Sequence, residues 1–270
     1  MDHMQHFAYG PITPIAAYVM SFIGSFLGLR CATRARADTG TGRLSWVVCA
    51  ALAIGGAGIW VMHFVAMLGF GVDGTEIRYD VWLTIASAVL AVVIVGIGMF
   101  LVVVFGGRRA WILLPAGVVT GVGVAAMHYA GMAAMEMSAR VSYDETWVVL
   151  SVLVAVAAAT AALWFGVRLR GLPATIGAAA VMGLAVSGMH YSGMVGMHVE
   201  VVPGLSEPSG ATAGQLLVPS LVVVGVLAVV LVSIVSTSPD EDEMNRIAEL
   251  QRILEERRRG TAAPGAPPRG

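Results

Sequence analysis

The chain has 270 residues, of which 57% are hydrophobic and only 12% are charged. A soluble domain normally carries about 25% charged residues, so this composition predicts a membrane protein. All sixteen basic residues are arginine, which excludes a retinal photoreceptor because its Schiff base needs a lysine. The two cysteines, Cys31 and Cys49, are too few for a disulfide framework, and we expect both to be free.

Seven apolar segments follow one another along the chain, and each is long enough to cross the ~30 Å hydrocarbon core of a bilayer. They cover residues 11–29, 45–70, 81–105, 111–135, 146–167, 173–196 and 216–237. Because no Asp, Glu or Arg lies inside them, histidines are the distinctive polar groups at membrane depth. We predict an all-α polytopic membrane protein with seven transmembrane helices, forming one domain over residues 1–237.

Arginine is distributed unevenly between the two sets of loops. Fourteen of the sixteen follow spans 1, 3 and 5 or lie in the tail, whereas only Arg78 and Arg140 lie in the other loops. Short cytoplasmic loops hold the excess of positive charge in membrane proteins. We therefore predict that the N-terminus is outside and the C-terminus is cytoplasmic, with the chain in the lipid bilayer of the cell (plasma) membrane.

Three segments at the outer ends of spans 2, 4 and 6 align without gaps. They read MHFVAM at 62–67, MHYAGM at 127–132 and MHYSGM at 189–194. Each histidine also has a glycine seven residues before it, namely Gly56, Gly121 and Gly183, which we interpret as packing positions. The spacing between successive copies of the motif corresponds to one helical hairpin with its loops, so we predict three two-helix units followed by one additional helix.

The three motifs place histidines and methionines at one depth, about 25–27 Å along their helices and near the extracytoplasmic edge of the hydrocarbon. Imidazole suits several transition metals, but thioether is a soft ligand that favours copper. No carboxylate or thiolate shares this level, which argues against magnesium, calcium or an ordinary structural zinc site. The predicted copper ligands are His63, His128, His190, Met62, Met67, Met127, Met132, Met189 and Met194.

A single histidine in a membrane helix often only hydrogen-bonds to a neighbour, and methionine is a common core filler. Three copies at one depth favour a metal or cofactor role instead, because ionisable residues inside the membrane are functional by default. Tyr129, Tyr191 and His198 lie close enough in sequence to support the site from outside the ligand set.

The thrice-repeated M-H-[FY] motif resembles the MHYT domain, a bacterial integral membrane sensory module. The resemblance covers spans 1 to 6. It implies a copper site formed by the motif histidines and methionines, and sensing of oxygen, carbon monoxide or nitric oxide through that metal. The fourth motif position is Val65, Ala130 or Ser192 instead of threonine, and Phe64 replaces the first tyrosine. In many relatives the module precedes cytoplasmic domains that make or degrade cyclic di-GMP, or histidine kinase domains.

The composition changes abruptly after span 7. Ser238, Pro239 and Glu241 form a helix-start signal, so we predict a charged amphipathic helix over 238–260 and a disordered tail over 261–270. Residues 240–257 are expected to bind a cytoplasmic signalling partner or to self-associate.

These features lead us to expect a membrane sensor without catalytic activity of its own and without a nucleic-acid partner, which signals through a separate protein. Two alternatives remain open at this point. One is a copper carrier or permease, because histidine and methionine along a path suit a soft metal. The other is a haem-type membrane oxidoreductase that uses two of the histidines as axial ligands.

Overall fold

The computed structural model describes residues 4–202, 207–237, 246 and 249–256. The chain divides into two compact units, Met1–Val235 and Ser236–Gly270. In the second unit residues 249–256 are helical, with Leu250, Ile253 and Leu254 exposed. The predicted helix start at Ser238 and the predicted disordered tail over 261–270 lie outside the described residues.

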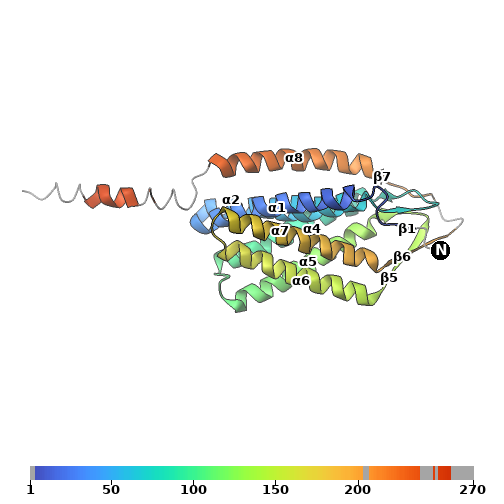
Figure 1. The fold of residues 1–270 in the computed structure, drawn as a ribbon, viewed down its shortest axis with the longest axis horizontal. Coiled ribbons are helices and arrows are strands. Elements are labelled where there is room, and N and C mark those ends of the chain that lie inside the picture. Colours follow the sequence, from blue (N-terminus) through green and yellow to red (C-terminus); the bar gives the residue numbers. More distant parts are fainter. Residues whose placement is uncertain (1–3, 203–206, 238–245, 247–248, 257–270) are drawn as a thin grey trace, which may run out of the picture. The chain divides into compact units, whose positions relative to one another are not determined.

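The first unit is a helical bundle, in agreement with the predicted fold class. Seven of the helices in the described part of the chain are long and apolar enough to cross a membrane. They are α1 (Ile12–Ala37), the continuous span of α2 (Gly40–Ala51), η1 (Leu52–Val61) and α3 (Met62–Met67), then α4 (Val81–Val104), α5 (Ala110–Ala133), α6 (Glu145–Arg168), α7 (Leu172–Val195) and α8 (Ala213–Thr237) (Figure 1).

The first six spans form a closed ring in chain order, because each packs on the next and α7 packs back on α1. Within this ring α3 also contacts both α5 and α7, so the three helices that carry the histidine motifs meet. Many valine, leucine and isoleucine side chains on the outer surfaces of the helices are exposed, which suits lipid rather than water as the surrounding medium.

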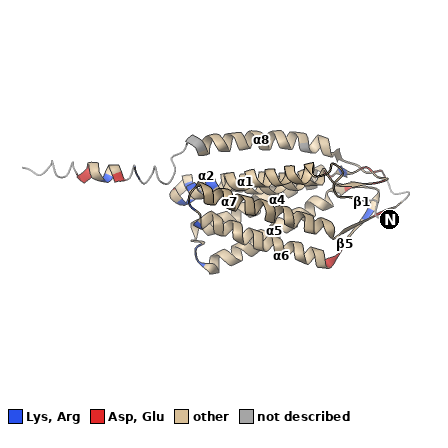
Figure 2. Ribbon diagram, in the orientation of Figure 1, with Lys and Arg blue, Asp and Glu red and all other residues tan. Residues whose placement is uncertain are grey.

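Charged residues lie at the ends of the bundle, and the spans between them carry almost none (Figure 2). Trp82 and Trp111, at the first turns of α4 and α5, are 80% and 68% exposed. Exposed tryptophan at helix ends is typical of the membrane interface. Together with the length of the seven helices, this arrangement identifies a membrane protein.

The first helix is longer than the predicted span 11–29. It continues through Arg34 and Arg36, whose guanidinium groups donate to the carbonyl oxygens of Val235 in α8 and Leu169 at the end of α6. Because these charges bind the free carbonyls at neighbouring helix ends, they extend the helix instead of ending it. The two cysteines are free, as predicted.

Short antiparallel strands, which the sequence analysis did not predict, join the loops at the end of the bundle where the motifs lie. The pairs are β1 (Met4–Gln5) with β2 (Gly71–Val72), β3 (Arg78–Tyr79) with β4 (Met135–Glu136) and with β7 (Ala211–Thr212), and β5 (Ala139–Tyr143) with β6 (Met197–Val201). Each motif helix is followed within four residues by a strand. The strands therefore connect the C-terminal ends of α3, α5 and α7 to one another's loops.

One backbone contact recurs at the end of each motif helix. The N–H groups of Asp80 and Asp144 donate to the carbonyls of Ala134 and Gly196, both at 2.8 Å, and Ala8 donates to Gly69 at 2.8 Å. Asp80 and Asp144 also cap α4 and α6 by accepting backbone N–H groups with their carboxylates. The start of a neighbouring helix, or the segment just before it, thus fixes each motif helix at its C-terminal end.

The span that carries the first motif contains a π-helical segment, η1, directly before the motif. Its tight packing point against α4 is Gly55, where a Cβ would lie 2.6 Å from the carbonyl oxygen of Ala91. Gly121 approaches the backbone of α6 in the same way. Gly56, which the sequence motif aligns with Gly121, would meet only a side-chain carbon at 3.8 Å. The packing glycine of the first motif therefore lies one residue earlier than predicted, and the wide turns of η1 take up the extra residue.

Candidate metal centre

His63 of α3, His128 of α5 and His190 of α7 converge on one point near the C-terminal ends of these helices, at one end of the ring. All three are at most 1% exposed. The Nδ1 atoms lie 3.0 Å apart for His63 and His190, 3.2 Å for His63 and His128, and 3.3 Å for His128 and His190. The sequence prediction that these residues share one level is confirmed. Within the described ranges, they are the one cluster of His, Cys, Asp or Glu side chains whose ligand atoms lie close enough together to hold a metal ion.

The three rings stand almost perpendicular to one another, with centroids 4.9–5.1 Å apart and interplanar angles of 83–88°. Each ring therefore directs its Nδ1 edge towards the shared point. The point equidistant from the three nitrogens lies about 1.8 Å from each, close to the ~2.0 Å length of a nitrogen–metal bond.

Hydrogen bonds alone cannot satisfy this arrangement. A ring nitrogen either carries a proton and donates or carries a lone pair and accepts, so three mutually facing nitrogens always include two with the same role. The Nε2 atoms offer no relief, because none of the three has a hydrogen-bond partner among the described residues. A single cation facing three lone pairs would remove the conflict at Nδ1, and the donor set thus fits a metal ion.

Two glycines of the motifs leave the space that two of the imidazoles occupy. A Cβ at Gly131 would overlap Nε2 of His63, and a Cβ at Gly193 would overlap Nε2 of His128. Each glycine lies three residues after the histidine of its own helix, on the same helix face. In the sequence these two positions are recognisable only as small residues within the motifs. The structure shows that they make room for the imidazole of another motif.

The aromatic residue that follows each histidine packs against the imidazole at its edge. The centroid distances are 4.8 Å for His63 and Phe64, 4.9 Å for His128 and Tyr129, and 5.0 Å for His190 and Tyr191, with near-perpendicular rings. These contacts restrict ring rotation in the first motif as much as in the others, although Phe64 has no hydroxyl.

The predicted supporting residues have different surroundings. The Tyr129 hydroxyl lies 2.8 Å from Ser151 Oγ of α6, a contact that the sequence pattern did not reveal. The Tyr191 hydroxyl is buried and has no hydrogen-bond partner within the described part of the chain. His198 lies on β6 opposite Ser142 and is exposed, outside the histidine cluster.

All six motif methionines that were predicted as ligands are at most 3% exposed. They are Met62, Met67, Met127, Met132, Met189 and Met194. Met67 lines a recess that also borders β2 and β3, whereas Met189 lines a cavity on the other side of the histidines, in the interior of the bundle. The methionines therefore occupy both sides of the histidine layer.

The ring of helices and the histidine cluster together define, in the described residues, a membrane protein of seven spans with a buried site of three histidines. The family model described as "Bacterial signalling protein N terminal repeat", MHYT, matches residues 56–115 and again 121–179. The two matches contain the first two motifs, so the resemblance is confirmed there, and the chain belongs to the MHYT family.

Curated bacterial signalling proteins are similar to this chain. The bifunctional diguanylate cyclase/cyclic di-GMP phosphodiesterase MucR of Pseudomonas aeruginosa is 40% identical over 193 residues, which cover 69% of this chain and 28% of MucR. The cyclic di-GMP phosphodiesterase NbdA of the same organism is 30% identical over 259 residues, covering 93% of this chain and 32% of NbdA. An uncharacterized signaling protein of Caulobacter vibrioides is 28% identical over 244 residues, which cover 87% of this chain and 29% of that protein.

The chain thus spans less than a third of the length of these curated relatives. No solved structure matches this chain.

Proposed function

We propose that the chain is the membrane sensor of a signalling system and that His63, His128 and His190 hold one copper ion through their Nδ1 atoms. The observation that carries this proposal is the triangle of Nδ1 atoms, buried in the bundle and without a consistent set of hydrogen bonds. The family membership and the names of the relatives support a signalling role.

The methionines favour copper over zinc or iron. Side chains in an α-helix lean towards its N-terminus, so Met67, Met132 and Met194, four residues beyond the histidines, lean back over the histidine level. Thioether sulfur at this level would add soft donors to the three nitrogens, a combination that selects copper. Bound copper would supply an open coordination position for oxygen, carbon monoxide or nitric oxide and a one-electron redox couple.

The protein's own residues prepare the site for such a ligand. The glycines at 131 and 193 leave room for two of the imidazoles, the aromatic neighbours fix the ring planes, and burial excludes bulk water. A bound ligand signals only if it favours one helix packing over another. The meeting of α3, α5 and α7 at one point means that a shift at any histidine acts on three spans of the ring.

The arginine distribution supports an orientation with the histidines near the extracytoplasmic face and the second unit in the cytoplasm, in the plasma membrane. The exposed Leu250, Ile253 and Leu254 then offer a surface for a cytoplasmic signalling partner or for self-association through 240–257. The names of MucR and NbdA make synthesis or breakdown of cyclic di-GMP the output that we propose for that partner.

The geometry is less suited to the two alternatives. Axial haem ligands stand on opposite sides of the iron, about 4 Å apart, whereas these Nδ1 atoms are 3.0–3.3 Å apart on three sides of one point. A permease needs ligand stations along a path, but the layer on the inner side of the histidines is formed by the apolar side chains of Ile59, Val124 and Val186.

The deciding experiment is elemental analysis of the purified full chain after loading with copper(I) and removal of free metal. We expect about one copper per chain, and loss of copper in the triple variant His63→Ala, His128→Ala, His190→Ala. The control is His198→Ala, which removes an exposed imidazole and should keep the metal. Equal copper content in the triple variant and the unmodified protein would refute the proposal.

A further inference from the structure

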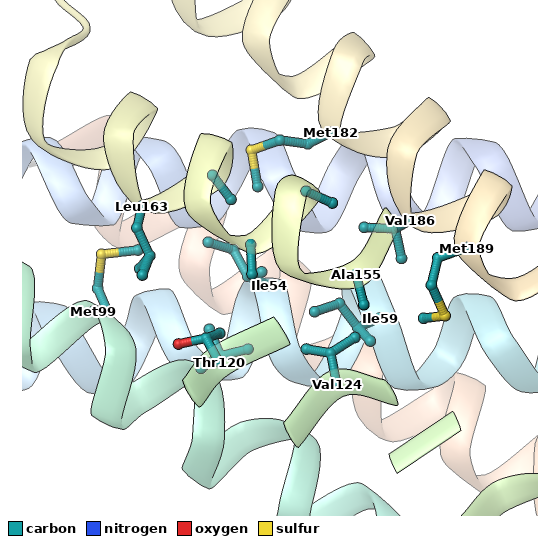
Figure 3. A pocket seen from close by; sticks show the side chains of 14 residues that line it. Ile54, Ile59, Met99, Thr120, Val124, Ala155, Leu163, Met182, Val186 and Met189 are labelled. Atoms are coloured by element: carbon teal, nitrogen blue, oxygen red, sulfur yellow. The ribbon is translucent and has the colours of Figure 1, made fainter. Parts of the chain in front are cut away.

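A second feature lies against the histidine centre on its inner side. η1, α4, α5, α6 and α7 enclose a cavity of about 40 Å³ in the interior of the bundle (Figure 3). Its lining is apolar apart from Thr120, whose hydroxyl has no hydrogen-bond partner among the described residues. Empty cavities of this kind are dry and accept apolar guests.

The cavity borders the layer of side chains directly inside the three imidazoles. Ile59, Val124 and Val186 each precede a motif histidine by four residues, about 6 Å or one turn along the helix, and all three line the cavity. Met189, which lies next to His190 in sequence, lines it as well (Figure 3). A guest in the cavity would therefore be separated from the imidazoles by a single layer of residues.

The wall between the cavity and the surface of the bundle is thinnest on the α6 side. Most lining residues are buried, but Ala158 and Ala162 are half-buried, so the cavity ends at two small side chains on the lipid-facing part of α6. Large side chains that would close the wall are absent at these two positions. An apolar molecule dissolved in the bilayer can approach there without crossing the strands that cover the outer end.

The size of the cavity limits the guest. An apolar cavity of about 150 Å³ accepts benzene, and this one has roughly a quarter of that volume. It is too small for a lipid chain or an aromatic ring and suits a single large atom or a diatomic molecule. The near absence of polar partners excludes a stable water in most of it, because a buried water needs two to four hydrogen bonds.

We infer that this cavity is a docking site for a small uncharged gas, which enters from the bilayer beside α6 and reaches the histidine centre from its inner side. The access role rests on the proposed metal function, whereas the docking site does not. The inference assigns a role to α6 residues that carry no motif and would be assigned only lipid contact from their sequence.

Xenon tests the docking site, because it binds to apolar cavities and requires no metal. The full chain is purified without metal in lipid nanodiscs, and xenon binding is followed by ¹²⁹Xe NMR. We expect binding to the unmodified protein and its loss in Ala159→Leu, where the added atoms fill the cavity. Ala157→Leu is the matched control, because residue 157 is exposed on the same helix and outside the lining. If Ala159→Leu does not fold, Ala162→Leu at the rim replaces it.

The access role is tested with carbon monoxide and the copper(I)-loaded chain. We expect association in Ala159→Leu to slow by about tenfold at unchanged copper content, because the gas must wait for packed helices to separate. Ala157→Leu should match the unmodified protein.

The two arms separate the possible failures. Absence of xenon binding to the unmodified protein, or equal binding to both leucine variants, would overturn the docking site. Equal carbon monoxide association rates in copper-loaded variants would overturn the access role. A chain that binds xenon but no copper would refute the proposed function and the access role and would leave the docking site standing.

Discussion

In the second and third motif spans, α5 and α7 continue as regular α-helix from the packing glycine to the histidine. In the first motif span, η1 widens the helix and Gly55 takes the place that Gly121 has in α5. The Nδ1 atoms of the three histidines nevertheless lie within 3.3 Å of one another. The position of the imidazole is therefore the same in all three motifs, although the backbone that leads to it differs.

The first motif also differs at its neighbours. It has Ala66 where the other motifs have Gly131 and Gly193, and Phe64 where they have tyrosine. Its end is held by Ala8, which precedes α1, and the Pro11 cap of α1 accepts no hydrogen bond through a side chain. The second and third motifs are held by the aspartates that cap α4 and α6.

The largest effect is expected where glycine makes room for an imidazole. In Gly193→Ala the new methyl group would overlap His128 and turn it away from the shared point. We expect copper affinity to fall by about 10–100-fold, the usual cost of disturbing the support of a metal ligand. Competition with a copper(I) chelator measures it.

The control for this variant lies on the same helix. Gly188→Ala adds a methyl group with nothing within 4 Å, so its copper affinity should equal that of the unmodified protein. Equal affinities for both variants would show that the second and third motifs do not need glycine after the histidine.

The next effect tests the π-helical segment. Gly55→Ala would place a Cβ 2.6 Å from the Ala91 carbonyl oxygen, whereas Gly56→Ala would place one 3.8 Å from Val92. We expect Gly55→Ala to lower the free energy of unfolding by about 1–3 kcal/mol, as overpacking does, and Gly56→Ala to have little effect. Thermal denaturation in detergent compares the two. Greater damage from Gly56→Ala would mean that the helix has the regular register of α5.

A smaller effect distinguishes the two tyrosines. Tyr129→Phe removes a hydroxyl that hydrogen-bonds to Ser151 and should cost about 0.5–1.5 kcal/mol of unfolding free energy. Tyr191→Phe removes a buried hydroxyl without a hydrogen-bond partner in the described ranges and should be neutral or stabilising. A double-mutant cycle with Ser151→Ala measures the first interaction. Similar losses for both tyrosines would show that the Ser151 contact is not what distinguishes them.

The smallest effect concerns the cap of α6. The backbone N–H groups of Trp147 and Thr146 donate to the Asp144 carboxylate and hold its pKa below the ordinary range. The native state therefore binds this proton less readily than the unfolded chain, and the stabilisation is lost as the pH falls through the acidic range.

We expect the melting temperature of the unmodified protein to fall between about pH 5 and pH 2 slightly more than that of Asp144→Ser, which keeps a cap without a charge. Parallel pH profiles for the two proteins would contradict an ionised cap.

Composition and periodicity were sufficient for the parts of the fold that depend on hydrophobicity. The seven spans and the common level of His63, His128 and His190 follow from apolar length and residue counting, and both are confirmed. The helix ends agree with the predictions within a few residues except where Arg34 and Arg36 extend α1, because their partners are carbonyls far away in sequence.

The remaining features depend on geometry that leaves little trace in a sequence. Most strands have two residues, which is too short for an alternating pattern to be visible. The wide turns of η1 have no residue signature, and a gapless motif hides them. The orientation of each Nδ1 depends on contacts such as that between His63 and Gly131, which lie on different spans.

The one-residue offset in η1 has a consequence for the history of the chain. A residue inserted into a regular α-helix turns everything beyond it by about 100°. If η1 were a regular α-helix, either Gly55 or His63 would point away from its partner. The wide turns instead absorb the extra residue between two fixed points, so a structural alignment of the three copies needs a gap where the sequences show none. Length variation between relatives in this short stretch is therefore compatible with an unchanged centre.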